Sequence, residues 1–191
     1  MLILRSLGSH KFSTSTIVSV ERKSGRSGEL VLVTVRHEIR ANGVLAVTDE
    51  HDIVYRQAPQ QGAPPPPASE PDSARGADFR RTVSPDPVLL FRYSALTFNG
   101  HRIHYDRSYV TGVEGYPGLV VHGPLQATLL LDLLDRHVPG TRVASFAFRA
   151  RSPLFDTASF DVCGAHQGAS VRLWTSTPDG RIAMDAVAEL A

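Results

Sequence analysis

Several residue classes are scarce in this chain of 191 residues, and each shortage excludes a kind of protein. The single cysteine, Cys163, leaves no partner for an intramolecular disulfide and no thiol pair for zinc, which favours a reducing compartment. An excess of charge of one sign is also missing, because 20 Lys and Arg residues stand against 19 Asp and Glu residues, for a formal net charge of +1. Such a balance produces no long-range field that would attract nucleic acid or an anionic membrane, and we expect neither as a partner.

Long apolar runs are absent as well. No run approaches the roughly 20 residues that a membrane-spanning helix needs, and residues 1–8 are too short for the apolar region of a secretory signal. We therefore expect a cytoplasmic protein. The hydrophobic fraction of 42% is enough for one good core or for two small domains.

Three segments of different composition follow one another along the chain. Residues 1–57 predict a meander of strands, because valine, isoleucine and threonine dominate and Asn42-Gly43 is typical of a tight hairpin turn. Residues 58–87 are rich in proline, with an unbroken run at 64–67, and predict an extended linker. Residues 88–191 form a second unit with a different plan.

Helical patterns open this second unit. A short helix is expected over 89–96, followed by a polar, His-rich loop and then by a Gly-rich passage. The convincing long helix covers 124–137, with Gly123 as its cap and Pro124 as its first residue. Leucines occupy nearly every side of this helix, so we expect other elements to enclose it.

Strand patterns complete the second unit. They cover 142–150, 159–166, 171–177 and 181–190, and Asp179-Gly180 marks a further hairpin. One enclosed helix followed by an antiparallel meander predicts the α+β class and its hot-dog arrangement, a sheet wrapped around a helix. The strand, turn and strand at the end resemble those of 29–55, which suggests two related halves.

The stretch Asn99-Gly-His-Arg-Ile-His104 is the densest polar constellation in the chain. It resembles the loop that precedes the central helix in (R)-specific enoyl-CoA hydratases and MaoC-like dehydratases, which reads Asp, any residue, Asn or His, Pro, an aliphatic residue, His. Asn99 takes the Asp place and His104 the place of the catalytic His. The stretches 91–106, 115–124 and 148–156 are similar to the branch of mesaconyl-CoA and itaconyl-CoA hydratases and type 2 hydroxyacyl-thioester dehydratases.

This resemblance implies a hot-dog hydro-lyase that adds water reversibly across the double bond of an enoyl thioester. The substrate would be an acyl-CoA, and no cofactor is expected apart from the CoA that the substrate carries. His104 would exchange the proton, because imidazole has a reference pKa of about 6.5. Asn99 would orient the water, and the amide of Gly123 at the helix start would stabilise negative charge on the thioester oxygen.

Further residues near these three are expected to contact substrate: His101, Arg102, Tyr105, Gly118, Val121, His122 and Arg149. For His122 a capping role at the helix start is an equal alternative, and His101 is also explained by a role in shaping the loop. Arginines such as Arg149 suit CoA phosphates. The spacing of His101 and His104 fits no common zinc pattern, so no metal is expected.

Two departures from the family pattern leave alternatives open. Because an amide cannot act as a base, the Asn at 99 requires His104 to carry proton transfer alone or to share it with Asp106. The first unit also shows strands without a helix, which predicts a truncated double hot-dog whose exposed sheet is covered in a homodimer or higher oligomer.

Two other functions compete with hydration. A hot-dog thioesterase would share the helix and the amide donors but would place a carboxylate on or near that helix. The sequence offers Asp132, which lies deep along the helix and too far from its start to serve comfortably. A non-catalytic remnant that binds acyl thioesters is the other alternative.

Overall fold

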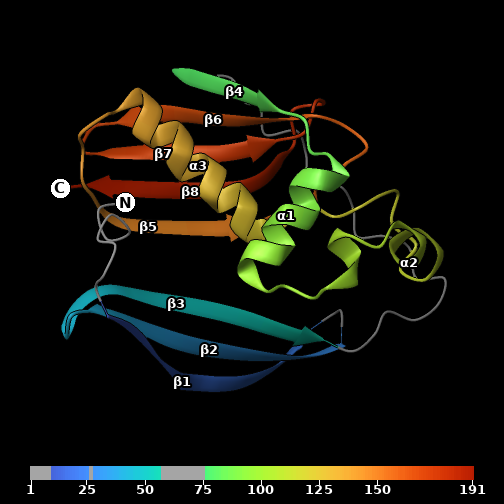
Figure 1. Ribbon diagram of the computed structural model, residues 1–191, viewed down its shortest axis with the longest axis horizontal. Helices are drawn as coiled ribbons and strands as arrows, with labels where there is room; N and C mark the ends of the chain where they lie inside the picture. The colour runs from blue at the N-terminus through green and yellow to red at the C-terminus, as the bar shows by residue number, and fades with distance from the viewer. Residues whose placement is uncertain (1–9, 26–27, 57–75) are drawn as a thin grey trace. The chain divides into compact units, whose positions relative to one another are not determined.

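The chain forms two compact units, Met1–Pro66 and Pro67–Ala191. The computed structural model describes residues 10–25, 28–56 and 76–191. Each unit is built around an antiparallel sheet of its own, of three strands in the first and five in the second (Figure 1).

The first unit is a meander of long strands in the order β1-β2-β3. The strands are β1 (Lys11–Gly25), β2 (Gly28–Ala41) and β3 (Val44–Arg56). Asn42 and Gly43, with φ of 50° and 81°, join β2 to β3. Two successive positive φ values are what a tight hairpin of the predicted kind requires, so the meander and its Asn-Gly turn are confirmed.

The two faces of this sheet differ in polarity. On one face Val33 pairs with Val20 and Ile53, while on the other Arg36 forms an ion pair with Glu50. None of residues 10–24 and 29–55 is buried. The described part of the first unit therefore supplies no cover for its own apolar face.

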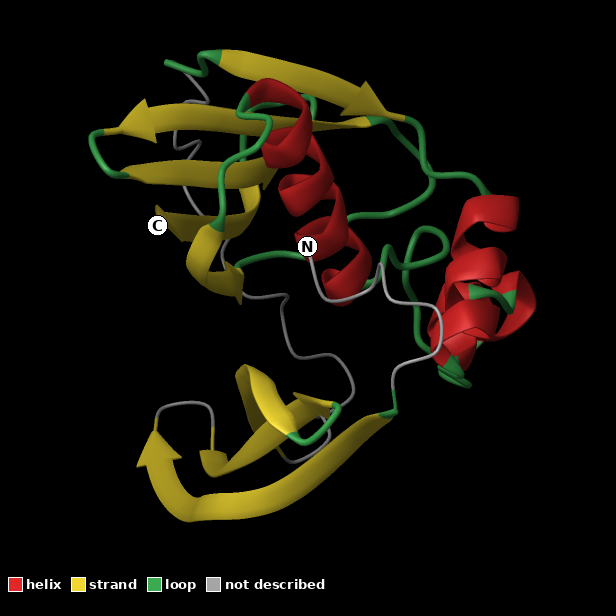
Figure 2. Cartoon of the chain, turned by 60° about the vertical axis from the view of Figure 1, so that its left-hand side comes forward, coloured by secondary structure: helices red, strands yellow, loops and turns green. Residues whose placement is uncertain are grey.

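The second unit carries the helices and the larger sheet. Its helices are α1 (Pro87–Thr97), α2 (Arg107–Gly112) and α3 (Gly123–His137), with a short 3-10 helix, η2 (Arg102–His104), between α1 and α2. Its strands are β4 (Phe79–Val83), β5 (Val143–Ala150), β6 (Phe160–Gln167), β7 (Ser170–Ser176) and β8 (Ile182–Leu190), in the order β4-β6-β7-β8-β5. Figure 2 shows α3 lying across one face of this sheet. A long helix packed on an antiparallel sheet is the predicted α+β plan.

Strand β4 corrects the predicted linker, which was drawn over 58–87. Phe79 and Val83 are buried at the two ends of β4 and pair with Gly164 and Phe160 of β6. Gly164 allows this, since a Cβ at that position would lie 2.1 Å from Cε2 of Phe79. The prolines on either side of β4 predict a linker, but apolar contacts with β6 stabilise a strand there. The rest of the predicted linker, up to residue 75, lies outside the described residues.

Helix α3 buries its sheet-facing side in the core. Leu130 and Leu133 are fully buried, and the hydroxyl of Thr175 on β7 donates to Oε1 of Gln126 at 2.7 Å, which ties the helix to the sheet. Within the second unit, Thr128 and Asp135 are exposed on the side of α3 away from the sheet. The expected enclosure of the helix by other elements therefore stays a prediction. The leucines cover more of the helix surface than this sheet alone contacts.

Candidate active site

His104, at the end of η2, is a buried imidazole whose hydrogen-bonding pattern is fixed by the backbone. Its Nδ1 lies 2.7 Å from the carbonyl oxygen of Val120. A carbonyl oxygen only accepts, so Nδ1 carries the hydrogen and Nε2 holds a free lone pair. The ring therefore presents Nε2 as its basic atom.

The ring of His104 is stacked on the ring of His122. The two centroids are 3.7 Å apart and the planes differ by 17°. Since His122 directly precedes Gly123, the first residue of α3, this stack brings the polar loop to the start of the long helix. The structure thus brings together His104, His122 and Gly123, as the sequence pattern predicts.

His122 is itself held from the α1 side. Its Nε2 lies 2.8 Å from the hydroxyl of Ser94, and the ring of Tyr93 meets its ring edge-on at 4.9 Å. Its Nδ1 is buried and has no hydrogen-bond partner among the described residues. His122 occupies the N-cap position of α3, as the capping alternative expects, but its side chain makes no capping hydrogen bond.

Burial shifts the proton affinity of both rings. Loss of water, followed by the charge of His104, lowers the pKa of His122 to about 4. Burial also lowers the pKa of His104, an effect that the Val120 hydrogen bond opposes and the charge of His101 reinforces. Both imidazoles are therefore neutral at neutral pH, and His104 is in the form that accepts a proton.

The start of α3 offers backbone donors. Its N-cap is His122 and its first residue is Gly123, one position earlier than predicted, and Pro124 stands second. The first amides of a helix have no hydrogen-bond partner within it. Pro124 has no amide hydrogen, and the side chain of His122 does not cap this end of the helix. A Cβ at Gly123 would meet only Cε of Met184, at 3.9 Å, so packing within the chain does not require glycine there.

Asn99 shapes the loop between α1 and η2. Its Oδ1 accepts from the amide of His101 at 3.0 Å, and its own amide donates to the carbonyl of Ser94 at 2.9 Å. The preceding residue, Phe98, ends α1 in the left-handed conformation with φ of 53°. The interpretation that Asn99 orients a water molecule stays a prediction, and the observed role of its oxygen is to hold the turn.

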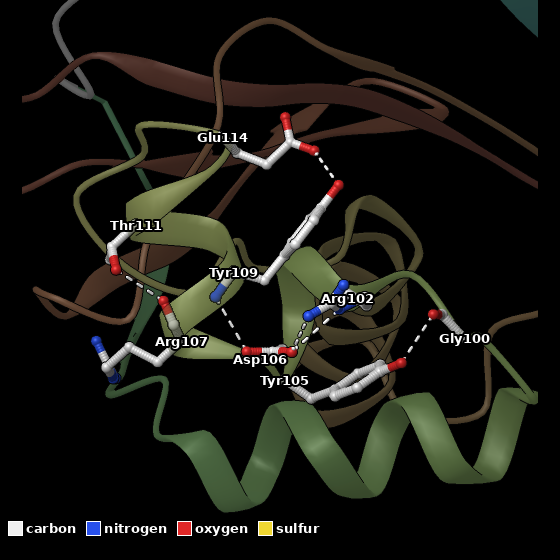
Figure 3. A network of polar contacts seen from close by, with 8 residues as sticks. All are labelled: Gly100, Arg102, Tyr105, Asp106, Arg107, Tyr109, Thr111 and Glu114. Carbon is white, nitrogen blue, oxygen red and sulfur yellow. Dashed lines mark hydrogen bonds and ion pairs between the residues drawn. The ribbon is translucent and has the colours of Figure 1, made fainter.

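Arg102 and Tyr105 belong to a polar network around α2 (Figure 3). Arg102 donates through two nitrogens to Oδ2 of Asp106, at 3.0 and 2.7 Å, and stacks over the ring of Tyr109. The hydroxyl of Tyr105 donates to the carbonyl of Gly100. Within the described residues these side chains therefore have contacts that shape the loop, and substrate contact by either stays a prediction.

Asp106 is not a second base. Its Oδ1 accepts from the Tyr109 amide at 3.0 Å and thereby caps α2. This hydrogen bond and the one from Arg102 hold the pKa of Asp106 below its ordinary value. A carboxylate so occupied accepts protons poorly near neutral pH.

Gly118 and Val121 have structural explanations. A Cβ at Gly118 would lie 2.5 Å from Oδ1 of Asp156, whose carboxylate also accepts from the Leu119 amide and pairs with Arg107. Val121 is buried in the core, and its amide donates to the carbonyl of Leu154. The expectation that Gly118 lets a ligand approach stays a prediction, and the observed effect of its missing side chain is to make room for Asp156.

Arg149 and His101 are exposed side chains of the second unit. Arg149 is exposed on the edge strand β5, and among the described residues it makes no hydrogen bond or ring contact with His104 or His122. His101 is exposed, and its ring centroid lies 6.3 Å from that of His104.

Within the described part of the chain, no three His, Cys, Asp or Glu side chains are grouped so as to hold a metal. No helix there is both long and apolar enough to traverse a bilayer.

Ser94 and Asp156 are the contributors that the sequence pattern did not single out. Ser94 falls four residues after the buried Leu90, on the apolar side of α1, and a polar residue on such a face is a sign of a buried hydrogen bond. Asp156 is the last residue of the stretch 148–156, but nothing local in the sequence connects it with Gly118.

The model of one protein family, hydroxyacyl-thioester dehydratase type 2, matches residues 5–156. The chain belongs to this family. It is 48% identical over 174 residues to the mesaconyl-C(4)-CoA hydratase of Chloroflexus aurantiacus, a match that covers 91% of this chain and 61% of that protein. It is also 39% identical over 93 residues to the mitochondrial hydroxyacyl-thioester dehydratase type 2 of Schizosaccharomyces pombe, covering 48% and 30% of the two chains.

Among solved structures, a MaoC-like dehydratase from Phytophthora capsici matches with a TM-score of 0.68 at 18% identity, over 94% of this chain and 61% of that one. The family and hot-dog fold predicted from the sequence are thus confirmed. The chain spans about three fifths of the length of its Chloroflexus relative and a smaller part of the yeast one.

Proposed function

We propose that this chain adds water reversibly across the double bond of an enoyl thioester carried by CoA. One observation carries the proposal: a buried imidazole, His104, is locked with Nε2 as its basic atom beside the start of α3. Membership of the type 2 dehydratase family supports it. The relative that is 48% identical is named for mesaconyl-C(4)-CoA, so a mesaconyl-type acyl group is the first candidate substrate.

In this proposal His104 moves one proton in each direction of the reaction. As the oxygen of water bonds to the β-carbon, Nε2 takes the proton of that water, and the electron pair of the double bond moves towards the thioester carbonyl. The amide of Gly123 and the helix dipole stabilise the negative charge on that oxygen. Nε2 then returns the proton to the α-carbon, which completes the addition. No electron leaves the substrate, so the reaction calls for no redox cofactor.

Hydrolysis of the thioester is less well supported. Its candidate carboxylate, Asp132, is in ion pairs with Arg81 and Arg136, and the hydrogen bonds from Arg136 and Arg81 hold its pKa below the ordinary value. Asp132 lies nine positions after Gly123, or roughly 14 Å along a helix at about 1.5 Å per residue. That distance removes Asp132 from the amide donors at the helix start.

One assay distinguishes the candidate functions. The purified full chain is incubated with crotonyl-CoA and with mesaconyl-CoA, while the absorbance of the conjugated thioester and the release of free thiol are recorded together. Hydration lowers the absorbance without thiol release, and faster loss with mesaconyl-CoA supports the proposed acyl group. Thiol release would indicate a thioesterase, and the absence of both signals would indicate a remnant that binds acyl thioesters.

We also propose that the chain works as a homodimer or higher oligomer. The support is the apolar face of β1, β2 and β3, where Ile17 is 65% and Val20 62% exposed. Exposed apolar surface of this extent is a poor match for a free monomer in water. Light scattering on the purified chain at micromolar concentration should give at least twice the monomer mass, and a uniform monomer would overturn this.

For location we propose the cytoplasm, which the single cysteine supports. The Schizosaccharomyces relative is named as mitochondrial, so fractionation of cells that express the tagged chain is the test. Recovery in the mitochondrial fraction would replace this proposal.

A further inference from the structure

Three buried polar side chains from three elements form a row that ends at the candidate base, His104. Ser94 lies on α1, His122 at the N-cap of α3, and His104 in η2. The hydroxyl of Ser94 lies 2.8 Å from Nε2 of His122, and the ring of His122 stacks on that of His104 at 3.7 Å. All three side chains are buried, which places the row in the core and away from solvent.

We propose that Ser94 and His122 are positioning residues that set the ring plane of His104 and so aim its Nε2. This inference rests on the proposed function, and it gives Ser94 and His122 a part in the reaction without contact with substrate. It also replaces the expectation that His122 binds substrate.

The need for a second contact follows from geometry. The hydrogen bond from Nδ1 to the carbonyl of Val120 fixes one point of the His104 ring, but the ring can still tilt about that bond. A flat surface at 3.7 Å, nearly parallel to the ring, removes this freedom. A displacement of about 1 Å at a reacting group is enough to cost on the order of a hundredfold in rate, so control of the tilt matters.

The surface that controls the tilt must itself be fixed, and Ser94 does this. The hydrogen bond at Nε2 sets the rotation of the His122 ring, and Tyr93 contacts the ring from its edge. Nδ1 of His122 is buried without a partner, and a bare lone pair is cheaper to bury than a bare N–H. Nε2 therefore carries the hydrogen and donates to Ser94. A phenyl ring at this position would keep the stack but lose the anchor.

The electrostatics of the pair suit a base that gains and loses a proton. Because the pKa of His122 is lowered to about 4, this ring stays neutral while His104 cycles. A neutral aromatic face next to the imidazolium form of His104 attracts it, whereas a second cation would repel it. Among the described residues, the other titratable groups in ring contact with the pair are the exposed His101 from the loop and Tyr93 from α1.

Kinetics of single and double variants test the row. In His122→Phe the stack remains without its anchor, and we expect kcat for hydration to fall about tenfold to a hundredfold with KM changed less than about twofold. Ser94→Ala should lower kcat about fivefold to tenfold. If Ser94 acts only through His122, the double variant should be no slower than His122→Phe by more than about twofold. Multiplied effects in the double variant, or a loss expressed in KM, would overturn the inference.

A matched control separates positioning from general loss of stability. Thr175→Val removes another buried hydrogen bond of the same unit, the one between Thr175 and Gln126. We expect it to lower Tm about as much as Ser94→Ala does, while kcat stays within twofold of the unchanged chain. An equal fall of kcat in Thr175→Val would mean that Ser94 and His122 act only through stability.

A spectroscopic readout keeps this test independent of activity. NMR of the imidazole nitrogens in the full chain should show His104 as the Nδ1–H tautomer, which the Val120 hydrogen bond maintains. The variants should keep this tautomer, but their Nε2 signal should shift and broaden because the ring is free to tilt. An unchanged His104 signal in both variants would refute the positioning role even with an active hydratase. Absence of hydration with the expected NMR changes would instead refute the proposed function and leave the row standing.

Discussion

The backbone of Val120 holds the loop that carries His104 through two hydrogen bonds in opposite directions. The amide of Val120 donates to the carbonyl of Ile103 at 3.0 Å, and its carbonyl accepts from Nδ1 of His104 at 2.7 Å. The orientation of the imidazole thus depends on main-chain atoms, which no side-chain substitution at 120 removes.

Removal of this imidazole should abolish the reaction. His104→Ala takes away the one base the site offers, and general-base catalysis contributes typically 10² to 10⁴-fold, so we expect kcat to fall by about that factor. Circular dichroism and Tm show whether the fold is kept. His166→Ala, which removes an exposed imidazole on β6, is the matched control and should retain full rate. Near-normal turnover by His104→Ala would exclude His104 from the mechanism.

The pH dependence of the rate follows from the lowered pKa of His104. Hydration needs the neutral ring, so kcat/KM should be flat at neutral pH and fall on the acid side of a midpoint below 6.5. A rate profile measured from pH 4.5 to 8 gives this midpoint. A midpoint above 6.5 would mean that a carboxylate near the ring outweighs its burial.

Stability should depend on pH through His122. Its pKa is about 4 in the folded chain and about 6.5 when unfolded, so the unfolded state binds the proton first as pH falls. The stability that the neutral form of His122 contributes is fully present above pH 6.5 and is lost as pH falls from 6.5 to 4. This loss amounts to about 3 kcal/mol, at about 1.4 kcal/mol per pKa unit. Urea unfolding at several pH values measures it. Because carboxylates also titrate at low pH, the comparison is with His122→Phe, which should lose less stability across this interval. Parallel curves would show that His122 titrates normally.

Asn99 places an amide where the family pattern has a carboxylate, and substitutions at this position test the effect of that difference on the rate. Asn99→Asp keeps an oxygen that accepts from the His101 amide, so the turn should survive, and the added carboxylate should raise kcat several-fold and move the acid midpoint of the rate upwards. Asn99→Ala loses the turn contact and should be slower than the unchanged chain. Equal rates for the unchanged chain, Asn99→Asp and Asn99→Ala would mean that the side chain at 99 does not contribute to the rate.

Local patterns in the sequence predicted what depends on local physics. The strands, α3 and the turn at Asn42-Gly43 follow from periodicity and from the need for positive φ. The two imidazoles at 104 and 122 followed from a motif. The hydrogen bond between Ser94 and His122 joins residues 28 positions apart, so no local sequence pattern includes both of them. Strand β4 escaped for the same reason, because its stability comes from pairing with β6, some 80 residues later.

Gly118 illustrates a glycine whose purpose only the structure reveals. In Gly118→Ala the new methyl would lie 2.5 Å from Oδ1 of Asp156 and 2.8 Å from Cγ2 of Thr157, so one of them must move. We expect a loss of about 1 to 3 kcal/mol of unfolding free energy, measured by denaturant titration. Gly112→Ala, with nothing within 4 Å of its added methyl, is the control and should be neutral or slightly stabilising. A loss as large in Gly112→Ala would show that the methyl itself, and not the clash, matters.

Gly123 should show the opposite behaviour, which makes it the sharpest test of the helix start. The methyl of Gly123→Ala would meet only Cε of Met184 at an ordinary contact distance of 3.9 Å, so Tm should stay within a few degrees of the unchanged chain. The same methyl would stand beside the amide that is proposed to bind the thioester oxygen. Loss of one such donor costs about 10² to 10³-fold in kcat, and a partial obstruction should cost at least about tenfold. Stability and rate must therefore separate at this position, whereas at Gly118 the added methyl is expected to lower stability. Full activity in a folded Gly123→Ala would remove this amide from the reaction and leave His104 without an electrophilic partner.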